Sequence, residues 1–209
     1  MIDSRKENET SEYVKKHFRK QLKKIPLNKR LFLDETGSYL NMSLACGRSK
    51  KGNPVYERKL TRTNQKLNTI AVISHKGLKV CRHYKRALNT QQFIYFLDYF
   101  VLPVLKNETL IMDKHPVHCA KEVKEFMIKN KIRFLYLPPY STDLNPIENV
   151  FSKVKLVIKT HQPKTIDRLK YIMKLAFQSV SEKDYRAYFR HAFSCLFYRI
   201  KFKPILYLS

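Results

Sequence analysis

The sequence predicts an α/β protein in which helices cover a mixed β-sheet. Short apolar runs separated by turn residues come first along the chain, and strand-like runs then alternate with amphipathic helices. Strands followed by strand–helix alternation are typical of a layered domain with a mixed sheet. Apolar residues make up 44% of the 209 residues, which is enough for a buried core. We therefore expect one folded domain with terminal extensions.

The two ends of the chain are predicted to lie outside that domain. Residues 1–28 are expected to form a basic helical arm or linker, because apolar residues recur at helical spacing among lysines and arginines until Pro26 ends the pattern. We place the core domain over residues 29–160 and a C-terminal helical extension over residues 161–209.

The first half of the core is predicted to hold three or four strands before the first long helix. Residues 31–33 form a short apolar run, and the Asp and Gly residues of 34–37 predict that this strand ends at a turn. Residues 39–46 are a candidate hairpin partner for it. Residues 69–74 and 78–84 are further apolar runs on either side of a predicted turn.

The second half alternates strands with helices. Its helices are recognised by an apolar face at helical spacing, and its strands by short apolar runs. The expected elements, in order, are a helix N-capped by Thr90, a strand over 109–112, a helix over 120–127, a strand over 132–137, a helix beginning near Pro146, and helices over 166–179 and 182–199.

The charge balance predicts a nucleic-acid partner. Lys and Arg total 42 against 17 Asp and Glu, a formal net charge of +25. Such a protein attracts polyanions, because each phosphate that it neutralises releases counterions. AT-biased coding is an alternative source of part of the lysine content. The basic segment 48–66 contains the predicted DNA-binding residues Arg48, Lys50, Lys51, Arg58, Lys59 and Arg62.

Several protein classes are excluded by the sequence. No apolar run approaches the roughly 18 residues that a membrane span needs, and the polar N-terminus does not resemble a signal peptide. The four cysteines show no paired spacing, which favours reduced thiols over disulfides or a zinc site; they are Cys46, Cys81, Cys119 and Cys195. We expect a soluble, intracellular protein.

Three acidic residues occupy positions where a site could form. Asp34 and Asp113 each follow three apolar residues of a predicted strand, and functional crevices of α/β sheets lie at strand ends. A turn role explains either aspartate alone better, and the balance changes only when both are taken with a third acid. Glu148 is the third of these acids. It lies at the start of a predicted helix, where the sequence Asn-Pro-Ile-Glu also fits a capping box. A capping box does not explain the stiff, proline-rich run over 137–144 that precedes it.

The sequence resembles a known family at this point. LPPYSTDLNPIENVFSKVK, residues 137–155, is similar to the signature around the last acid of DDE transposases of the mariner superfamily and related bacterial insertion-sequence transposases. FLDETG and LIMDKHPVHCA resemble the segments that carry the first and second acids. The 34 residues between Asp113 and Glu148 are a spacing that marks one large branch of the family. The resemblance covers about residues 28–160.

The resemblance implies a fold and a chemistry. The fold is RNase H-like, a five-stranded mixed sheet with its first three strands antiparallel and helices on both faces. Asp34, Asp113 and Glu148 would be the catalytic residues and the ligands of two Mg²⁺ ions, with Mn²⁺ as a substitute. Such a site would cleave DNA at an element end and join that end to target DNA.

The resemblance also implies partners and alternatives. The expected partners are double-stranded DNA, a second copy in a homodimer, and a separate helix-turn-helix half, because the 33 residues before Asp34 do not contain one. The expected location is the bacterial cytoplasm, associated with the nucleoid. The alternatives are an inactive remnant that acts only as a basic DNA-binding or regulatory protein, and an RNase H-like nuclease of another family.

Residues beside the three acids carry further expectations. Lys114 stands where the family has Asn, and strand alternation predicts that its side chain points away from the metals. Glu35 is expected on the opposite face of the strand from Asp34, exposed or in a turn. A zinc site at His115 and His118 is the weaker interpretation, because paired loop histidines are more often exposed to solvent.

Overall fold

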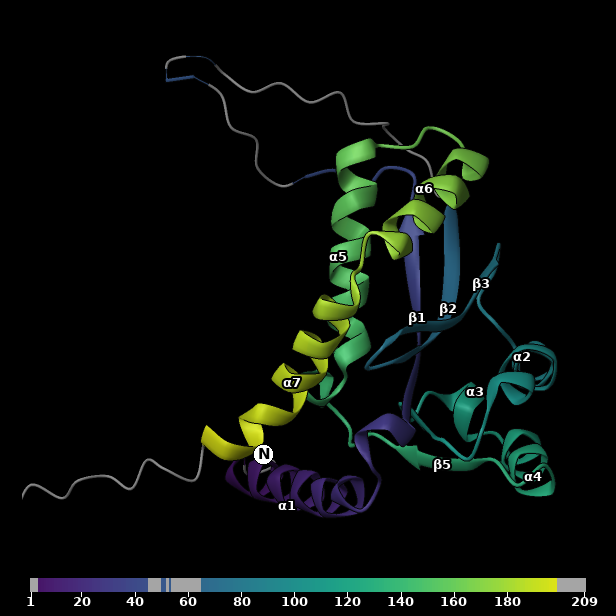
Figure 1. The fold of residues 1–209 in the computed structure, drawn as a ribbon, viewed down its shortest axis with the longest axis vertical. Coiled ribbons are helices and arrows are strands. Elements are labelled where there is room, and N and C mark those ends of the chain that lie inside the picture. Colours follow the sequence, from purple (N-terminus) through teal and green to yellow (C-terminus); the bar gives the residue numbers. More distant parts are fainter. Residues whose placement is uncertain (1–3, 45–49, 52, 54–64, 199–209) are drawn as a thin grey trace, which may run out of the picture.

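The computed structural model describes residues 4–44, 50–51, 53 and 65–198, and its centre is a five-stranded sheet (Figure 1). The strand order is β3-β2-β1-β4-β5. The strands are β1 (Arg30–Tyr39), β2 (Lys66–Ser74), β3 (Gly77–Tyr84), β4 (Thr109–Met112) and β5 (Arg133–Tyr136). The first three pair antiparallel, whereas β4 and β5 run parallel to β1. The predicted mixed sheet is confirmed.

The first strand is longer than predicted. β1 continues through residues 34–37, which the sequence indicated as a turn, because these residues pair in register with residues 68–71 of β2. The ladder satisfies their backbone groups and overrides their turn propensity. The hairpin partner predicted over 39–46 is also wrong: residues 41–44 form no strand, and β2 takes that position.

Helices cover both faces of the sheet. The helices are α1 (Ser4–Lys23), α2 (Thr90–Phe96), α3 (Pro116–Cys119), α4 (Lys121–Lys129), α5 (Pro146–His161), α6 (Ile166–Gln178) and α7 (Glu182–Tyr198). α2 continues into a π-turn over Leu97–Val101. In Figure 1, α5, α6 and α7 lie on one side of the sheet and α2, α3 and α4 on the other.

The alternation of β1 side chains separates the two cores. Phe32 packs in the core beneath α5, α6 and α7, whereas Leu31 and Leu33 pack in the core beneath α2 and α4. Because successive side chains of a strand point to opposite faces, Asp34 lies on the α5 side and Glu35 on the α2–α4 side. This alternation gives the two adjacent acids different surroundings.

The first helix of the second half begins one residue earlier than predicted. Asn89, not Thr90, is the N-cap of α2: its side-chain oxygen accepts the Gln92 N–H at 2.8 Å, and the Gln92 side chain accepts the Asn89 N–H at 3.2 Å. Asn and Thr both cap helices, so the reciprocal contact with Gln92 selects between the two residues.

Both terminal segments contribute to the hydrophobic core. Phe18 and Leu22 of α1 are buried in the core on the α5 side. Tyr185 and Phe189 of α7 are buried in the same core, with the Phe189 ring in edge contact with Phe32 at 5.4 Å between centroids. The aromatic pattern of the last helix is therefore core packing, as predicted, in the part whose side chains the structure describes.

Only some of the residues in the remaining predictions, on DNA binding and on cysteines, are among the described residues. Lys50 and Lys51 are exposed, whereas the other four predicted DNA-binding residues, Arg48, Arg58, Lys59 and Arg62, lie outside the described residues. Cys81 and Cys119 are free thiols, and burial raises the pKa of Cys81 to about 12. None of the described helices is long and apolar enough to cross a membrane.

Candidate active site

A cleft of about 470 Å³ contains all three acids singled out by the sequence. Asp34 lies within β1, Asp113 directly follows β4, and Glu148 is in the first turn of α5. β1 and β4 are parallel neighbours, with Phe32 opposite Ile111, so the two aspartates occur at the same level of the sheet. The start of α5 brings the third carboxyl group to this point.

The rim of the cleft is stiff and strained. Pro138 and Pro139 lead into Tyr140, whose backbone has a φ of 53° and whose side chain is 95% exposed. A left-handed conformation is unfavourable for a residue with a Cβ, and such strain concentrates at functional sites. Ser141, which follows, is buried and donates its hydroxyl to the Pro139 carbonyl at 3.1 Å. The tyrosine ring is therefore held in solvent at the edge of the acidic cleft.

The Asp34 carboxylate is partly buried and accepts two hydrogen bonds. Its Oδ1 accepts the Glu35 N–H at 2.7 Å, and its Oδ2 accepts Nδ2 of Asn145 at 2.8 Å. Burial, with smaller contributions from the charges of Asp113 and Glu148, raises the pKa of Asp34 to about 7. The two hydrogen bonds do not offset the desolvation of the charged form. A charged Asp34 is therefore unfavourable in the cleft unless a cation neutralises it.

Asn145 does not cap α5, which corrects the capping-box interpretation. Its side chain makes no cap hydrogen bond, and it instead reaches Asp34 across 111 positions of the sequence. Pro146 occupies the first turn as predicted, where its missing N–H costs nothing. The sequence indicated Asn145 only as a cap, because its contact with a distant strand leaves no local pattern.

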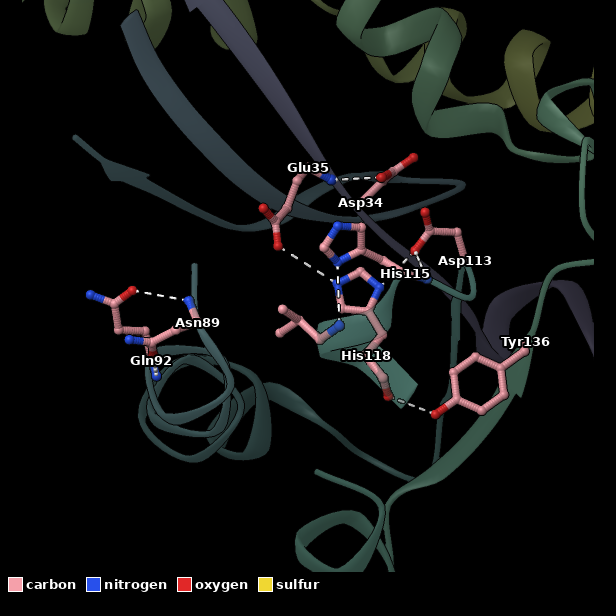
Figure 2. Close-up of polar contacts among 9 residues, drawn as sticks. Asp34, Glu35, Asn89, Gln92, Asp113, His115, His118 and Tyr136 are labelled. Carbon is pink, nitrogen blue, oxygen red and sulfur yellow. Dashed lines mark hydrogen bonds and ion pairs between the residues drawn. The ribbon is translucent and has the colours of Figure 1, made fainter. Parts of the chain in front are cut away.

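Asp113 is hydrogen-bonded to a buried histidine. His118 Nδ1 lies 2.7 Å from Asp113 Oδ1, and His118 Nε2 lies 3.6 Å from Glu35 Oε1 (Figure 2). His118 is 1% exposed, so the expectation of a solvent-exposed histidine pair is wrong for this residue. Glu35 is on the opposite face from Asp34, as predicted, but it is half-buried within β1 rather than in a turn.

The charges of His118 and Asp113 stabilise each other. Burial acts to lower the pKa of His118, but the hydrogen bond to Asp113 and the nearby carboxylate of Glu35 outweigh it and raise the pKa to about 9. Burial likewise acts to raise the pKa of Asp113, and the His118 contact brings it below its usual value. Both ring nitrogens of His118 face carboxylates, which argues against a zinc site here.

Lys114 lines the same cleft as Asp113 and is exposed. β4 ends at Met112, so the strand alternation used to predict the direction of its side chain does not extend to residue 114. Because the ammonium group is solvated, its repulsion of a cation in the cleft is screened.

The donor set fits a hard divalent cation. The three acids supply only oxygen ligands, which Mg²⁺ and Mn²⁺ prefer, and a bound cation would offset the burial cost that raises the pKa of Asp34. Within the described part of the chain, no three His, Cys, Asp or Glu side chains are already gathered as a metal cluster.

Comparisons with known proteins give one family match and several structural matches. The DDE superfamily endonuclease profile matches residues 29–170, and no curated protein sequence matches significantly. The crystal structure of the catalytic domain of Mos1 mariner transposase has a TM-score of 0.69 at 12% identity, covering 98% of both chains. The Mos1 strand transfer complex gives 0.73 at 15% identity, covering 93% of this chain and 62% of that one.

A third structure completes the comparison. The mariner Mos1 paired end complex with Mg gives a TM-score of 0.71 at 14% identity, covering 94% of this chain and 63% of that one. At these identities the likeness shows the fold, and it confirms the predicted RNase H-like fold. The chain spans less than two thirds of the Mos1 chains in these two complexes. Because the family match covers most of the sequence and includes all three cleft acids, this chain belongs to the DDE superfamily endonuclease family.

Proposed function

We propose that this chain is the catalytic domain of a DDE transposase of the mariner type, which cleaves DNA strands and transfers them with divalent metal ions held by Asp34, Asp113 and Glu148. The observation that carries the proposal is the convergence of these three carboxyl groups on one cleft, where burial and mutual repulsion raise the pKa of Asp34 to about 7. The family match and the Mos1-like fold support the same reaction class.

The residues of the cleft would have two roles, binding the metal ions and orienting the metal ligands. Asp34, on the central strand, and Asp113, at the end of its neighbour, supply ligands from a rigid sheet, and Glu148 supplies one from the start of α5. Asn145 holds one Asp34 oxygen in a fixed direction. When bound, two Mg²⁺ ions would supply activation of the attacking oxygen and stabilisation of the leaving oxygen. Mn²⁺ is a substitute with the same oxygen preference.

The partners follow from the same proposal. The substrates are double-stranded DNA element ends and target DNA, which the basic segment 48–66 would contact. We further propose a homodimer that works with a helix-turn-helix unit supplied in trans and acts at the bacterial nucleoid. The Mos1 paired-end complex with left transposon end and the Mos1 strand transfer complex, which this chain matches over 56% and 62% of their chains, support a DNA substrate.

The test is metal-dependent DNA cleavage. The purified chain should nick supercoiled plasmid, and join a duplex with a free 3′-hydroxyl end to it, with Mg²⁺ or Mn²⁺ but not with EDTA. Glu148→Gln should lower both rates by about 100-fold or more, because a lost ligand removes several kcal/mol of transition-state stabilisation. Glu122→Gln, at an exposed position on α4, is the matched control and should keep full activity.

Two outcomes would contradict the proposal. Equal rates for Glu148→Gln and the wild type would remove Glu148 from the site. A folded protein that binds DNA but neither cleaves nor joins it, even with a helix-turn-helix unit present, would instead support the inactive remnant that acts only as a DNA-binding or regulatory protein.

DNA binding should be electrostatic and nearly independent of sequence. We expect log Kd to rise linearly with log salt concentration, with a slope of about 0.9 for each phosphate contacted. The double substitution Lys50→Ala with Lys51→Ala should reduce this slope by about 1 to 2, as fluorescence anisotropy on a random duplex would measure. Lys121→Ala with Lys129→Ala, on exposed positions of α4, should leave the slope nearly unchanged. A salt-independent affinity would contradict the electrostatic interpretation.

A further inference from the structure

We propose that His118 and Glu35 form a positioning device that holds the Asp113 carboxylate in its metal-binding direction. The proposal rests on the proposed function, in which Asp113 is a metal ligand. His118 would act on the reaction only through Asp113, and Glu35 only through His118, so both are positioning residues rather than catalytic ones.

One oxygen of the Asp113 carboxylate is fully engaged in hydrogen bonds. Oδ1 accepts the His115 N–H at 3.1 Å and faces His118 Nδ1 at 2.7 Å. A carboxylate only accepts hydrogen bonds, so Nδ1 is the donor. Among the described residues, none hydrogen-bonds to the other oxygen, Oδ2. Two donors on one oxygen fix the rotation of the carboxyl group and leave Oδ2 for the cleft that Asp113 lines.

Packing and a backbone hydrogen bond hold the His118 side chain in one orientation. Its ring is buried and packs against Phe93 with 4.5 Å between ring centroids. Its backbone carbonyl accepts the hydroxyl of Tyr136, on β5, at 2.8 Å (Figure 2). α2 and β5 thus hold the ring and the backbone of His118 at the end of the sheet. Because the His118 ring is fixed by its surroundings, its hydrogen bond also fixes the orientation of the Asp113 carboxylate.

The other ring nitrogen of His118, Nε2, faces the carboxylate of Glu35. Nε2 is buried and has no hydrogen-bond partner, and its nearest carboxylate oxygen is Glu35 Oε1 at 3.6 Å. A buried N–H without a partner is costly, so Glu35 offsets that cost through its charge. Glu35 follows Asp34 directly in β1 and points to the opposite face. One strand therefore supplies a metal ligand on one face and, on the other, the anchor for a second ligand.

The arrangement corresponds to the outer-shell partners of metal ligands in other proteins. Groups that orient a ligating side chain affect metal affinity by about 10- to 100-fold when they are removed. A histidine that only satisfied polar atoms in the core would affect stability but not metal affinity. Metal affinity of the folded protein therefore separates the two roles.

The experiment measures Mn²⁺ binding to the full chain, by isothermal titration calorimetry and by the loss of the free Mn²⁺ electron paramagnetic resonance signal. His118→Leu should weaken Mn²⁺ binding by about 10- to 100-fold. His118→Asn keeps a donor near the Nδ1 position and should weaken it by less than about 5-fold. Glu35→Gln should have an intermediate effect, and Glu35→Gln added to His118→Leu should have no further effect, because Glu35 acts through His118.

A second histidine provides the matched control. His83 Nδ1 contacts Thr69 Oγ1 at 2.9 Å, away from the cleft. His83→Leu should lower thermal stability without changing Mn²⁺ affinity. If His118→Leu does not fold, Glu35→Gln and His118→Asn still provide the comparison.

The outcomes separate this inference from the proposed function. Folded His118→Leu and Glu35→Gln proteins that bind Mn²⁺ within about 2-fold of the wild type would overturn the positioning role, provided that Glu148→Gln weakens binding. A wild-type chain that binds no Mn²⁺, or binds it unchanged after Glu148→Gln, would overturn the metal site itself and with it the proposed function.

Discussion

The Asp34→Asn variant is expected to lose Mg²⁺-dependent strand cleavage by a factor of about 1,000 or more, and to be more stable than the wild type when metal is absent. The loss of activity follows from the removal of a charged ligand at the centre of the cleft. The gain in stability follows from the burial of the same carboxylate, whose pKa is raised from 3.8 to about 7 in the folded chain.

The direction of the pH dependence follows from proton linkage. Between about pH 4 and pH 7 the folded state keeps the Asp34 proton that the unfolded state has lost, so the free energy of unfolding falls as the pH rises through this window. Each pKa unit corresponds to about 1.4 kcal/mol. Because the Asn side chain remains neutral, we expect a gain of about 1–3 kcal/mol for Asp34→Asn at about pH 8 and almost none at about pH 4.

The measurement is urea unfolding at both pH values in EDTA, beside plasmid cleavage in Mg²⁺. The single side-chain carbonyl introduced by Asp34→Asn can accept only one of the two N–H groups that Asp34 accepts, from Glu35 or from Asn145, so the expected gain is smaller than the full pKa shift would give. Asp98→Asn, at an exposed position after α2, should change neither stability nor cleavage. A variant less stable than the wild type at the higher pH in EDTA would show that the Asp34 carboxylate has a structural role.

The Phe189→Ala variant is expected to lose about 3–5 kcal/mol of unfolding free energy, the usual cost of a large cavity in a core. The Phe189 ring is 1% exposed and contacts Phe32 of β1 edge-on, with further ring contacts to His75 and Phe193. Since Phe32 lies two residues before Asp34, the last described helix supports the strand that carries the first cleft acid.

Thermal and urea unfolding would measure this effect. Tyr13→Ala, whose ring is 72% exposed on α1, is the aromatic control and should change stability by less than about 0.5 kcal/mol. A loss below about 1 kcal/mol for Phe189→Ala would mean that α7 is a detachable extension. A chain ending at residue 160 would lack α6 and α7 and should not fold, because both helices contribute to the core on the α5 side.

Local patterns predicted most elements of this protein. The strand over 109–112, the start of a helix at Pro146 and the two final helices follow from apolar periodicity and proline, which act within a few residues. The three acids were indicated only together, by their positions after strands and at a helix start and by the resemblance of their three segments to one family. The basic character of the chain likewise requires only composition.

The tertiary structure decided what depends on distant partners. Asp34 lies within a strand and not at its end, because pairing with β2 satisfies residues 34–37. Asn145 binds Asp34 instead of capping its own helix, and His118 is buried between Asp113 and Glu35. Sequence alone determined which residues could form strands, helices and a metal site. Which side chains met was decided by the fold, because hydrogen bonds and burial depend on position in space and leave no periodic trace along the chain.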